Sequence, residues 1–469
     1  MRELLTVAWP LILSSGSVSL MHVVDRIFLT WHSRDALAAA MPAGLTFWTV
    51  LSLPMGLCMY VNTFVSQYEG AERPRRVARS VWQGVFLAVL GGVASLAFLP
   101  AAEPFFRAVG HAPPVCALES AYFSILTIGS LPMLLGAVLS CYFSGRGKTK
   151  AVMYVNIFTS MLNVTLDYLL IFGNGPFPKM GIHGAAWATV ISLTAGAVCY
   201  VVLMLPGRIA PRYEFWSQCR VDGELLRRLL RYGLPNGVQF LIDVAGFTLF
   251  ILIVGQTGTV QLAATNVTFN LNTFAFVPML GVGTSILILV GRRIGEGRPD
   301  VAARTTWNGF RLTSLYMLGF AAIYVLLPRL ILRPYSMFGD EGEFHAIEEQ
   351  SVVLLRFIAV FSVFDGMAIV FGSAVRGAGD TRFSLAFSVC CSVGLMVVPS
   401  LAVWMYASGN LYLLWTSCTV MIIVLGLGFL LRFRSGQWKS MRVIESTRET
   451  RDSAPVAESE AALATGSTG

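Results

Sequence analysis

Charged residues are scarce in this sequence. Only 13% of its 469 residues are Asp, Glu, Lys or Arg, about half of the share that is usual in soluble proteins. This shortage excludes a soluble multidomain enzyme, a nucleic-acid-binding enzyme and an intrinsically disordered protein. Because 55% of the residues are hydrophobic and the mean hydropathy is +0.67, we expect a polytopic membrane protein that contacts lipid over most of its surface.

Motifs for metal, nucleotide or covalent chemistry are also absent from the sequence. The eight cysteines are scattered without a CxxC pair, and the five histidines form no HExxH motif. We therefore expect neither a disulfide framework nor a metal site of that kind. The sequence has no GxxxxGK[ST] motif, which excludes an intrinsic ATPase pump. A membrane-embedded transferase would need His/Asp or metal motifs at a membrane face, so we expect no enzymatic activity and no cofactor.

Long apolar runs are abundant. A run of about 20 residues is long enough to cross the hydrocarbon core as a helix, and the sequence contains twelve of them. The fold class that we predict is an all-α membrane protein with twelve transmembrane helices. The predicted spans are 4–30, 37–67, 80–102, 118–144, 150–173, 182–205, 228–255, 260–291, 305–330, 346–375, 382–406 and 410–433.

The basic residues are distributed unevenly between the predicted loops. Of the 34 Lys and Arg residues, 26 lie in the loops after even-numbered spans or at the two ends of the chain, and 5 lie in the opposite loops. Loops rich in Lys and Arg stay in the cytoplasm, so both termini are predicted to be cytoplasmic. We expect a multi-pass protein of the plasma membrane, namely the bacterial inner membrane. The net positive charge then reflects topology and contact with anionic lipid, and no nucleic-acid partner is expected.

The two halves of the sequence repeat each other. Pro10 in AWPLI matches Pro235 in GLPNG, 225 residues later, and Gly56 matches Gly281 at the same offset. Each half has six spans, an even number, so the halves have the same orientation. This predicts two six-helix lobes that are related by a pseudo-twofold axis along the membrane normal, with a cavity between them. The predicted parts are an N-lobe at 1–205, a cytoplasmic linker at 206–227, a C-lobe at 228–433 and a disordered cytoplasmic tail at 434–469.

Acidic residues inside the predicted spans are the main candidates for function. A carboxylate that faces lipid costs about 2.5–3.5 kcal/mol on insertion scales, so these side chains should face the protein interior or a wet cavity. We interpret them as a proton or cation relay. The alternative is that they are buried, hydrogen-bonded carboxylates that only fix helix packing. The four residues are Asp25, Asp167, Asp243 and Asp365.

The fifth span carries a polar face. Asn156, Asn163 and Asp167 are separated by 7 and 4 residues, which puts them on one side of a helix. Asn and Asp supply hard oxygen atoms that suit Na⁺ or a proton network, and Asp25 of the first span offers a second carboxylate. Two carboxylates that approach each other in a low dielectric cannot both stay ionised unless a cation binds between them. An Asn–Asp ladder that only joins helices is the alternative.

A second polar lining is predicted in the C-lobe. Gln239 and Asp243 are one turn apart in the seventh span, and Asp365 lies in the tenth. The two acids are candidates for coupling H⁺ or Na⁺ in this lobe, whereas hydrogen bonding between helices without a ligand is the alternative. The candidates for lining a substrate cavity are Gln239, Asn266, Asn270 and Phe361.

Several short motifs carry a family resemblance over about residues 1–435. They are VVDRIF in the first span, NVTLDYLLIFG in the fifth, MGIHGAAWATVIS at the start of the sixth, GLPNG at the start of the second half, and RGAGDTR before the eleventh span. In this order they resemble the multidrug and toxic compound extrusion (MATE) family, within the superfamily that includes lipid-linked oligosaccharide flippases. The resemblance implies a cation or proton site in the first lobe and matches two acids in the second. The implied residues are Asp25, Asn163, Asp167 and Thr189 in the first lobe, with possible Na⁺ at the first three, and Asp243 and Asp365 in the second.

The resemblance also exposes two departures in the second lobe. One subfamily commonly has Glu where this sequence has Asp243, and Tyr where it has Phe361. The shorter carboxylate and the missing hydroxyl argue against a Na⁺ site in that lobe.

The function that we expect is secondary-active antiport. Entry of H⁺ or Na⁺ would drive the export of amphipathic, often cationic, organic compounds by a protein that acts as a monomer in the lipid bilayer. A flippase for lipid-linked oligosaccharides on the same fold is the nearest alternative. It should have a cavity rich in Arg and Lys, whereas the charges deep in these spans are mostly acidic. A channel is a further alternative, but paired lobes with buried acids fit alternating access better.

Overall fold

The computed structural model describes residues 1–109, 113–205, 211–336, 341–406 and 409–445, and in these ranges the chain forms helices and no strand. Eleven helical segments are long and apolar enough to cross a membrane, and a pair of helices bent by 42° at Gly129 makes a twelfth. The predicted all-α fold with twelve spans is confirmed. The chain is a multi-pass membrane protein.

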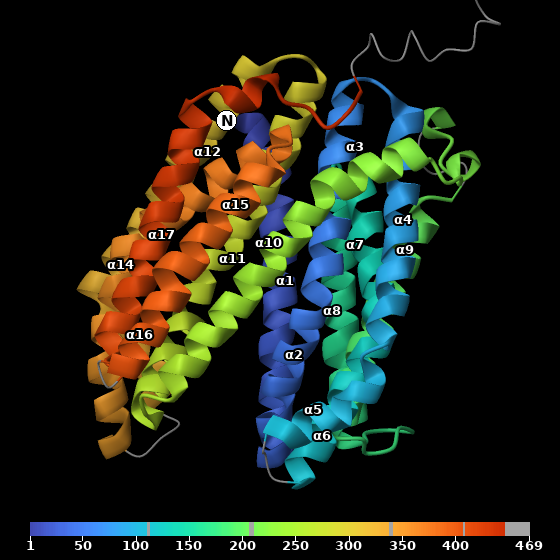
Figure 1. Ribbon diagram of the computed structural model, residues 1–469. Coiled ribbons are helices and arrows are strands. Elements are labelled where there is room, and N and C mark those ends of the chain that lie inside the picture. Colours follow the sequence, from blue (N-terminus) through green and yellow to red (C-terminus); the bar gives the residue numbers. More distant parts are fainter. Residues whose placement is uncertain (110–112, 206–210, 337–340, 407–408, 446–469) are drawn as a thin grey trace, which may run out of the picture.

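The first lobe forms the blue-to-green bundle of Figure 1. Local signals set several of its helix ends. The Ser33 side chain accepts a hydrogen bond from the Ala36 N–H at the start of the second helix, and Gly173 ends the eighth in a left-handed conformation, with φ of 73°. The helices are α1 (Arg2–His32), α2 (Arg34–Met59), α3 (Val61–Gly70), α4 (Pro74–Leu96), α5 (Ala102–Val109), α6 (Pro113–Ile128), α7 (Ser130–Ser144), α8 (Thr149–Phe172) and α9 (Ile182–Leu203).

The second lobe forms the yellow-to-red bundle, with the long α10 running obliquely across the view in Figure 1. Its α12 opens on Pro299, as α4 opens on Pro74, and these prolines are 225 residues apart. The repeat therefore sets equivalent helix starts in the two lobes. The helices are α10 (Gly223–Gly255), α11 (Thr259–Gly295), α12 (Pro299–Leu326), α13 (Pro328–Ser336), α14 (Glu341–Ala378), α15 (Thr381–Cys391), a π-helical turn (Ser392–Val397), α16 (Val398–Tyr406) and α17 (Leu411–Arg434).

Two predicted boundaries need correction. Helix α10 begins at Gly223, inside the segment 206–227 that we predicted as a linker, because Asp222 caps it by accepting a hydrogen bond from the Leu225 N–H. The prediction of a disordered tail from residue 434 is wrong for 434–445, where Gln437–Ser440 forms a 3₁₀ turn (η5) and Trp438 is buried. The rest of that predicted tail, and residues 206–210 of the linker, lie outside the described residues.

The lobes meet along a seam formed by α1 against α11 and by α2 against α10. A Cβ atom on Gly56 would lie 2.8 Å from Gly237 Cα, and a Cβ atom on Gly281 would lie 2.7 Å from Ile12 N. Gly56 is equivalent to Gly281 in the repeat, and Ile12 is equivalent to Gly237. The two contacts are therefore the same contact seen from either lobe, as the pseudo-twofold axis requires, and only glycine permits such close backbone approach.

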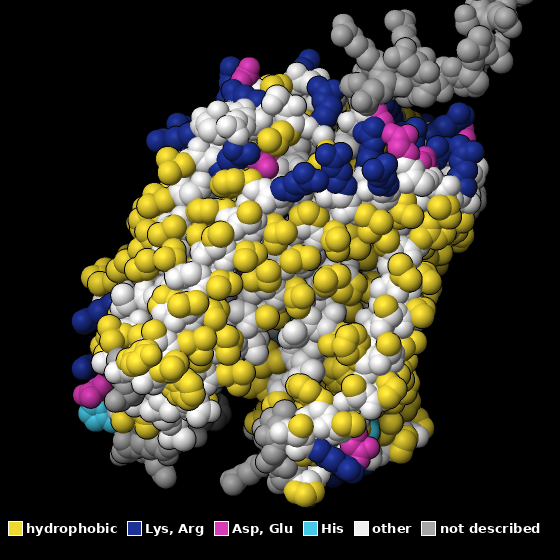
Figure 2. Space-filling model, in the orientation of Figure 1, with side chains coloured by type: hydrophobic (Ala, Val, Ile, Leu, Met, Phe, Trp, Pro, Cys, Tyr) yellow, Lys and Arg dark blue, Asp and Glu magenta, His cyan; other side chains and the backbone are white. Residues whose placement is uncertain are grey.

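Lys and Arg side chains gather at one end of the molecule, as Figure 2 shows, and the N-terminus lies at this end in Figure 1. We call it the basic end. The loops after α3 and α11 lie there, as does the last turn of α17. It carries Arg73, Arg76, Arg292, Arg293 and Arg434.

A cleft separates the lobes at the other end, where Figure 2 shows a hollow between them. The helix faces that form the seam become exposed towards the end opposite the basic end. Val23 of α1 lies on the face of Ile12 and is 48% exposed, and Phe274 of α11 lies on the face of Gly281 and is 67% exposed. Leu45 of α2 continues the same pattern. The seam is therefore closed near the basic end, and the cleft opens at the opposite end.

Candidate functional site

The first lobe holds a buried polar cluster on α8 and α9. Asp167 is 0% exposed and Asn163, one turn before it, is 1% exposed. The Asn163 amide can form hydrogen bonds with both Asp167 and Thr189 in one of its two orientations. In that orientation Nδ2 donates to Asp167 Oδ2 over 3.1 Å, and Oδ1 accepts from the Thr189 N–H over 3.3 Å. Three of the predicted site residues are thus brought together.

Asp25 of α1 joins this cluster. Its carboxylate lies near enough to Asp167 for the two charges to interact. Asp25 Oδ1 and Asp167 Oδ1 are both shielded from solvent and have no hydrogen-bond partner among the described residues. Two such oxygens in a low-dielectric interior are satisfied by a proton or by a bound cation. The Asp25–Asp167 pair can therefore hold a proton or a cation.

Tyr122 of α6 is a member of the cluster that the sequence analysis missed. This side chain is 7% exposed, and it lies within electrostatic reach of both Asp25 and Asp167. Its phenol can donate a hydrogen bond to a carboxylate. A tyrosine in an apolar span carries no periodic signal, so only the packing of α6 against its neighbours reveals it.

Asn156 lies apart from the cluster, although it shares the α8 face with Asn163. Its Nδ2 donates to Ser14 Oγ over 2.7 Å, and its Oδ1 accepts from the Tyr200 hydroxyl over 3.4 Å. These bonds join α8 to α1 and α9. Asn156 therefore ties helices together, and its predicted place in the cation site is not supported by its contacts.

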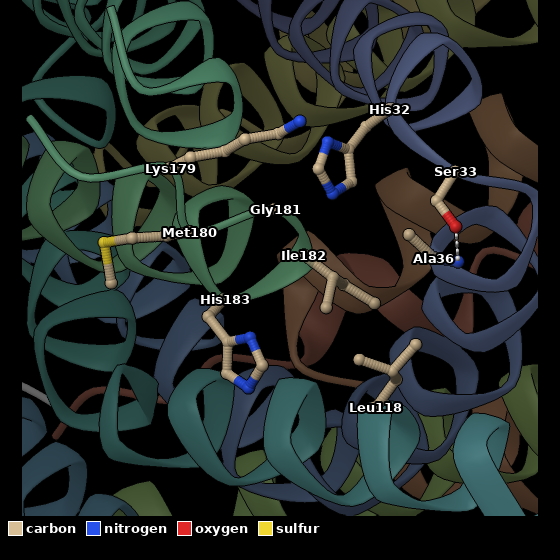
Figure 3. A pocket seen from close by; sticks show the side chains of 9 residues that line it. All are labelled: His32, Ser33, Ala36, Leu118, Lys179, Met180, Gly181, Ile182 and His183. Carbon is tan, nitrogen blue, oxygen red and sulfur yellow. Dashed lines mark hydrogen bonds between the residues drawn. The ribbon is translucent and has the colours of Figure 1, made fainter.

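A pocket of about 240 Å³ lies beyond the cluster, at the end opposite the basic end. Figure 3 shows the side chains of His32, Lys179 and His183 around it. Phe28 lies between Asp25 and His32 on α1. Its ring packs against that of Phe172 of α8, with the two centroids 5.8 Å apart. None of the predicted site residues lines this pocket.

The acids of the second lobe do not form a matching pair. Asp243 of α10 is exposed, and its charge interacts with that of Arg376. Asp365 of α14 is half-buried and lies near Cys418. Within the described ranges no interaction joins the two carboxylates, and neither forms an ion pair within 4 Å. The pseudo-twofold axis therefore relates the backbones of the lobes but not their acidic sites.

The four cavity candidates fall into two groups. On α11, Asn270 is exposed and lies 11 residues before Gly281, on the same face of the helix, whereas Asn266 is half-buried. Gln239 is 5% exposed and donates from Nε2 to Ser388 Oγ over 3.0 Å, inside the second lobe. Phe361 is 2% exposed in the hydrophobic core. Asn270 therefore faces the cleft, whereas Gln239 and Phe361 are buried and do not line it in this conformation.

Comparison with known families agrees with the two-lobed geometry. A family model described as MatE matches residues 10–169 and again residues 235–401. The chain belongs to the MatE family. Each match begins at one of the two prolines, Pro10 and Pro235, that the internal repeat makes equivalent.

Curated relatives in the MatE family cover nearly the whole chain. A probable multidrug resistance protein NorM of Thermotoga maritima is 26% identical over 457 residues, 96% of this chain and 95% of that protein. The corresponding protein of Deinococcus radiodurans is 29% identical over 448 residues, 93% of this chain and 96% of the relative. That of Brucella suis is 28% identical over 388 residues, 82% of each.

Solved structures show the same fold. An outward-facing multidrug resistance MATE family transporter of the MOP superfamily superposes with a TM-score of 0.85 at 20% identity, over 94% of this chain and 97% of the other. A MOP superfamily transporter from Pyrococcus furiosus gives 0.83 at 20% identity over the same shares. This chain therefore has the fold of these two proteins.

Proposed function

We propose that this protein is a secondary-active efflux transporter that exchanges H⁺ or Na⁺ for amphipathic, cationic organic molecules. The observation that carries the proposal is the Asp25–Asp167 pair, in which one buried oxygen of each carboxylate has no hydrogen-bond partner among the described residues, in a lobe that borders an open cleft. The names of the curated relatives, probable multidrug resistance proteins, support efflux of drugs.

The direction of transport follows from the orientation that we propose. Since Lys-rich and Arg-rich segments stay in the cytoplasm, the basic end is cytoplasmic and the cleft opens to the outside. The ion then enters the N-lobe site from the outside and lowers the negative charge of the Asp25–Asp167 pair, which releases the cationic substrate outward. The lobes close the cleft, reopen it at the basic end and discharge the ion into the cytoplasm.

The membrane potential drives this exchange through the net charge that crosses. A potential of 100 mV gives about 2.3 kcal/mol for each net elementary charge, which corresponds to an accumulation of roughly 50-fold. Exchange of one coupling ion for one singly charged organic cation moves no net charge, so the concentration gradient of the ion drives it. Entry of two ions in each cycle would add the contribution of the membrane potential.

The proposal is tested with everted membrane vesicles that contain the full chain and a fluorescent organic cation. An inward-acid proton gradient and a Na⁺ gradient are imposed separately. We expect one of the two gradients to drive accumulation of the cation inside the vesicles, and that gradient identifies the coupling ion. Accumulation that follows neither gradient would contradict the proposal. Vesicles without the protein are the control.

A further inference from the structure

The chain beyond α17 crosses the basic end of the molecule. We call residues 435–445 the C-terminal strap. Its first part is fixed to the second lobe, because Trp438 is fully buried, stacks on Phe433 with centroids 4.9 Å apart and donates from Nε1 to the Phe433 carbonyl over 2.8 Å. Lys439 Nζ also pairs with Asp300 of α12 over 2.8 Å.

The second part of the strap lies on the first lobe. The Val443 N–H donates to Gln67 Oε1 of α3 over 2.9 Å. The same Gln67 donates from Nε2 to the Gly377 carbonyl of α14 over 2.9 Å. The Tyr68 hydroxyl of α3 donates to the Glu445 carboxylate, with its two oxygens at 3.0 and 2.9 Å. Strap, α3 and α14 are therefore joined in one hydrogen-bonded network across the two lobes.

Glu445 is the charged member of this network. It is only 6% exposed, and Arg73 and Arg76 of the first lobe lie 3.6 and 3.9 Å from its oxygens. Arg228, at the start of α10, adds a third positive charge within electrostatic reach. A buried carboxylate held by a phenol and by cations is costly to leave without partners. Separation of α3 from the strap would expose both sides of this contact.

We propose that the C-terminal strap is a latch that holds the basic end closed, with Glu445 as the residue that must leave Tyr68 and Arg76 before the cleft opens at that end. This inference rests on the proposed function, because a latch matters only if the cleft changes sides. In the structure the strap bridges the lobes where the seam is closed. The latch therefore favours the conformation whose cleft opens at the opposite end.

The test is hydrogen–deuterium exchange with mass spectrometry on the full chain in lipid nanodiscs, comparing the wild type with Glu445→Gln. We expect exchange in α3 (Val61–Gly70) to rise by about tenfold, the effect of losing one hydrogen bond to a charged group. Exchange in the cleft-facing segments of α1 and α11 around Val23 and Phe274 should fall, since the cleft closes there. A change that stays within residues 435–445, or no change, would overturn the latch.

Two further variants sharpen this test. Tyr68→Phe removes only the hydroxyl that donates to Glu445, so it should reproduce the change in α3 and in the cleft-facing segments of α1 and α11. Glu214→Gln breaks an exposed ion pair with Arg75 that lies outside the strap and is the matched control, which should leave both regions as in the wild type. An equal response of Glu214→Gln would contradict the assignment to Glu445. The exchange readout needs no substrate or ion, so it fails or succeeds independently of the vesicle assay.

Discussion

Ser66 of α3 and Gly291 of α11 face each other across the seam, and they are equivalent residues of the internal repeat. A Cβ atom on Gly291 would overlap the Ser66 hydroxyl oxygen. That hydroxyl donates to the Thr63 carbonyl over 3.0 Å, so it is held in place. The pseudo-twofold axis passes between these residues, and one of the pair has to lack a side chain.

Gly291→Ala should therefore weaken the contact between the lobes. Overpacking at a tight contact costs about 1–3 kcal/mol, so we expect a lower melting temperature for the purified protein. Gly319→Ala on α12, where a Cβ atom meets nothing within 4 Å, is the matched control and should be neutral or stabilising. Exchange of the two residues, in Ser66→Gly with Gly291→Ser, should restore stability. A double variant as unstable as Gly291→Ala would show that the contact is not symmetric.

The two asparagines of α8 should respond differently to substitution. Asn156→Ala removes the bonds to Ser14 and Tyr200, so it should reduce stability by about 1 kcal/mol and leave the ion dependence of transport unchanged. Asn163→Ala removes the amide beside Asp167, and we expect the ion concentration for half-maximal transport to rise about tenfold. Thermal melting and ion titration of efflux distinguish the two effects. An altered ion dependence in Asn156→Ala would return that residue to the site.

The spans, the repeat and the family could be predicted because they depend on features that the sequence displays directly. The spans can be read from the length of each apolar run, and the repeat can be read from the constant offset that separates residues such as Pro10 and Pro235. Helical periodicity also placed Asn163 and Asp167 on one face. It could not show that Asn156, two turns away on the same face, contacts Ser14 instead. Periodicity gives the face of a helix on which a residue lies and does not give the residue that it contacts.

The order of the strap and the separation of Asp243 from Asp365 could not be predicted from the sequence. Residues 434–445 have no apolar periodicity, and their order comes from Trp438 meeting Phe433 and from Glu445 meeting Tyr68. Asp243 lies in α10 and Asp365 in α14, and no interaction joins the two carboxylates within the described residues. Tertiary packing decides such contacts, and one sequence does not encode them in any local pattern.

The segment before α10 predicts a dependence of stability on pH. Burial would raise the pKa of Asp222, but the Leu225 N–H and the guanidinium groups of Arg76 and Arg79 hold that pKa below its ordinary value of 3.8. A lowered pKa stabilises the folded protein above the ordinary value, and this contribution is lost as the pH falls through the folded-state pKa. Asp222→Asn should therefore lower the melting temperature at pH 6.

The same variant is compared with the wild type at a series of pH values. The difference in melting temperature should be constant above about pH 5 and should shrink below about pH 4, where the wild-type carboxyl group becomes protonated. Glu72→Gln, at an exposed position in the loop before α4, serves as the control. A difference that grows towards acid pH would contradict this account of Asp222.

The account depends most directly on the Asp25–Asp167 pair, and the decisive measurement is gradient-driven efflux in Asp167→Asn beside Asp365→Asn. Both variants keep the size of the side chain and remove its charge. We predict that Asp167→Asn folds and inserts but no longer responds to the imposed H⁺ or Na⁺ gradient, whereas Asp365→Asn retains most of the wild-type response. Full gradient-driven transport by Asp167→Asn would contradict the coupling site proposed for the first lobe.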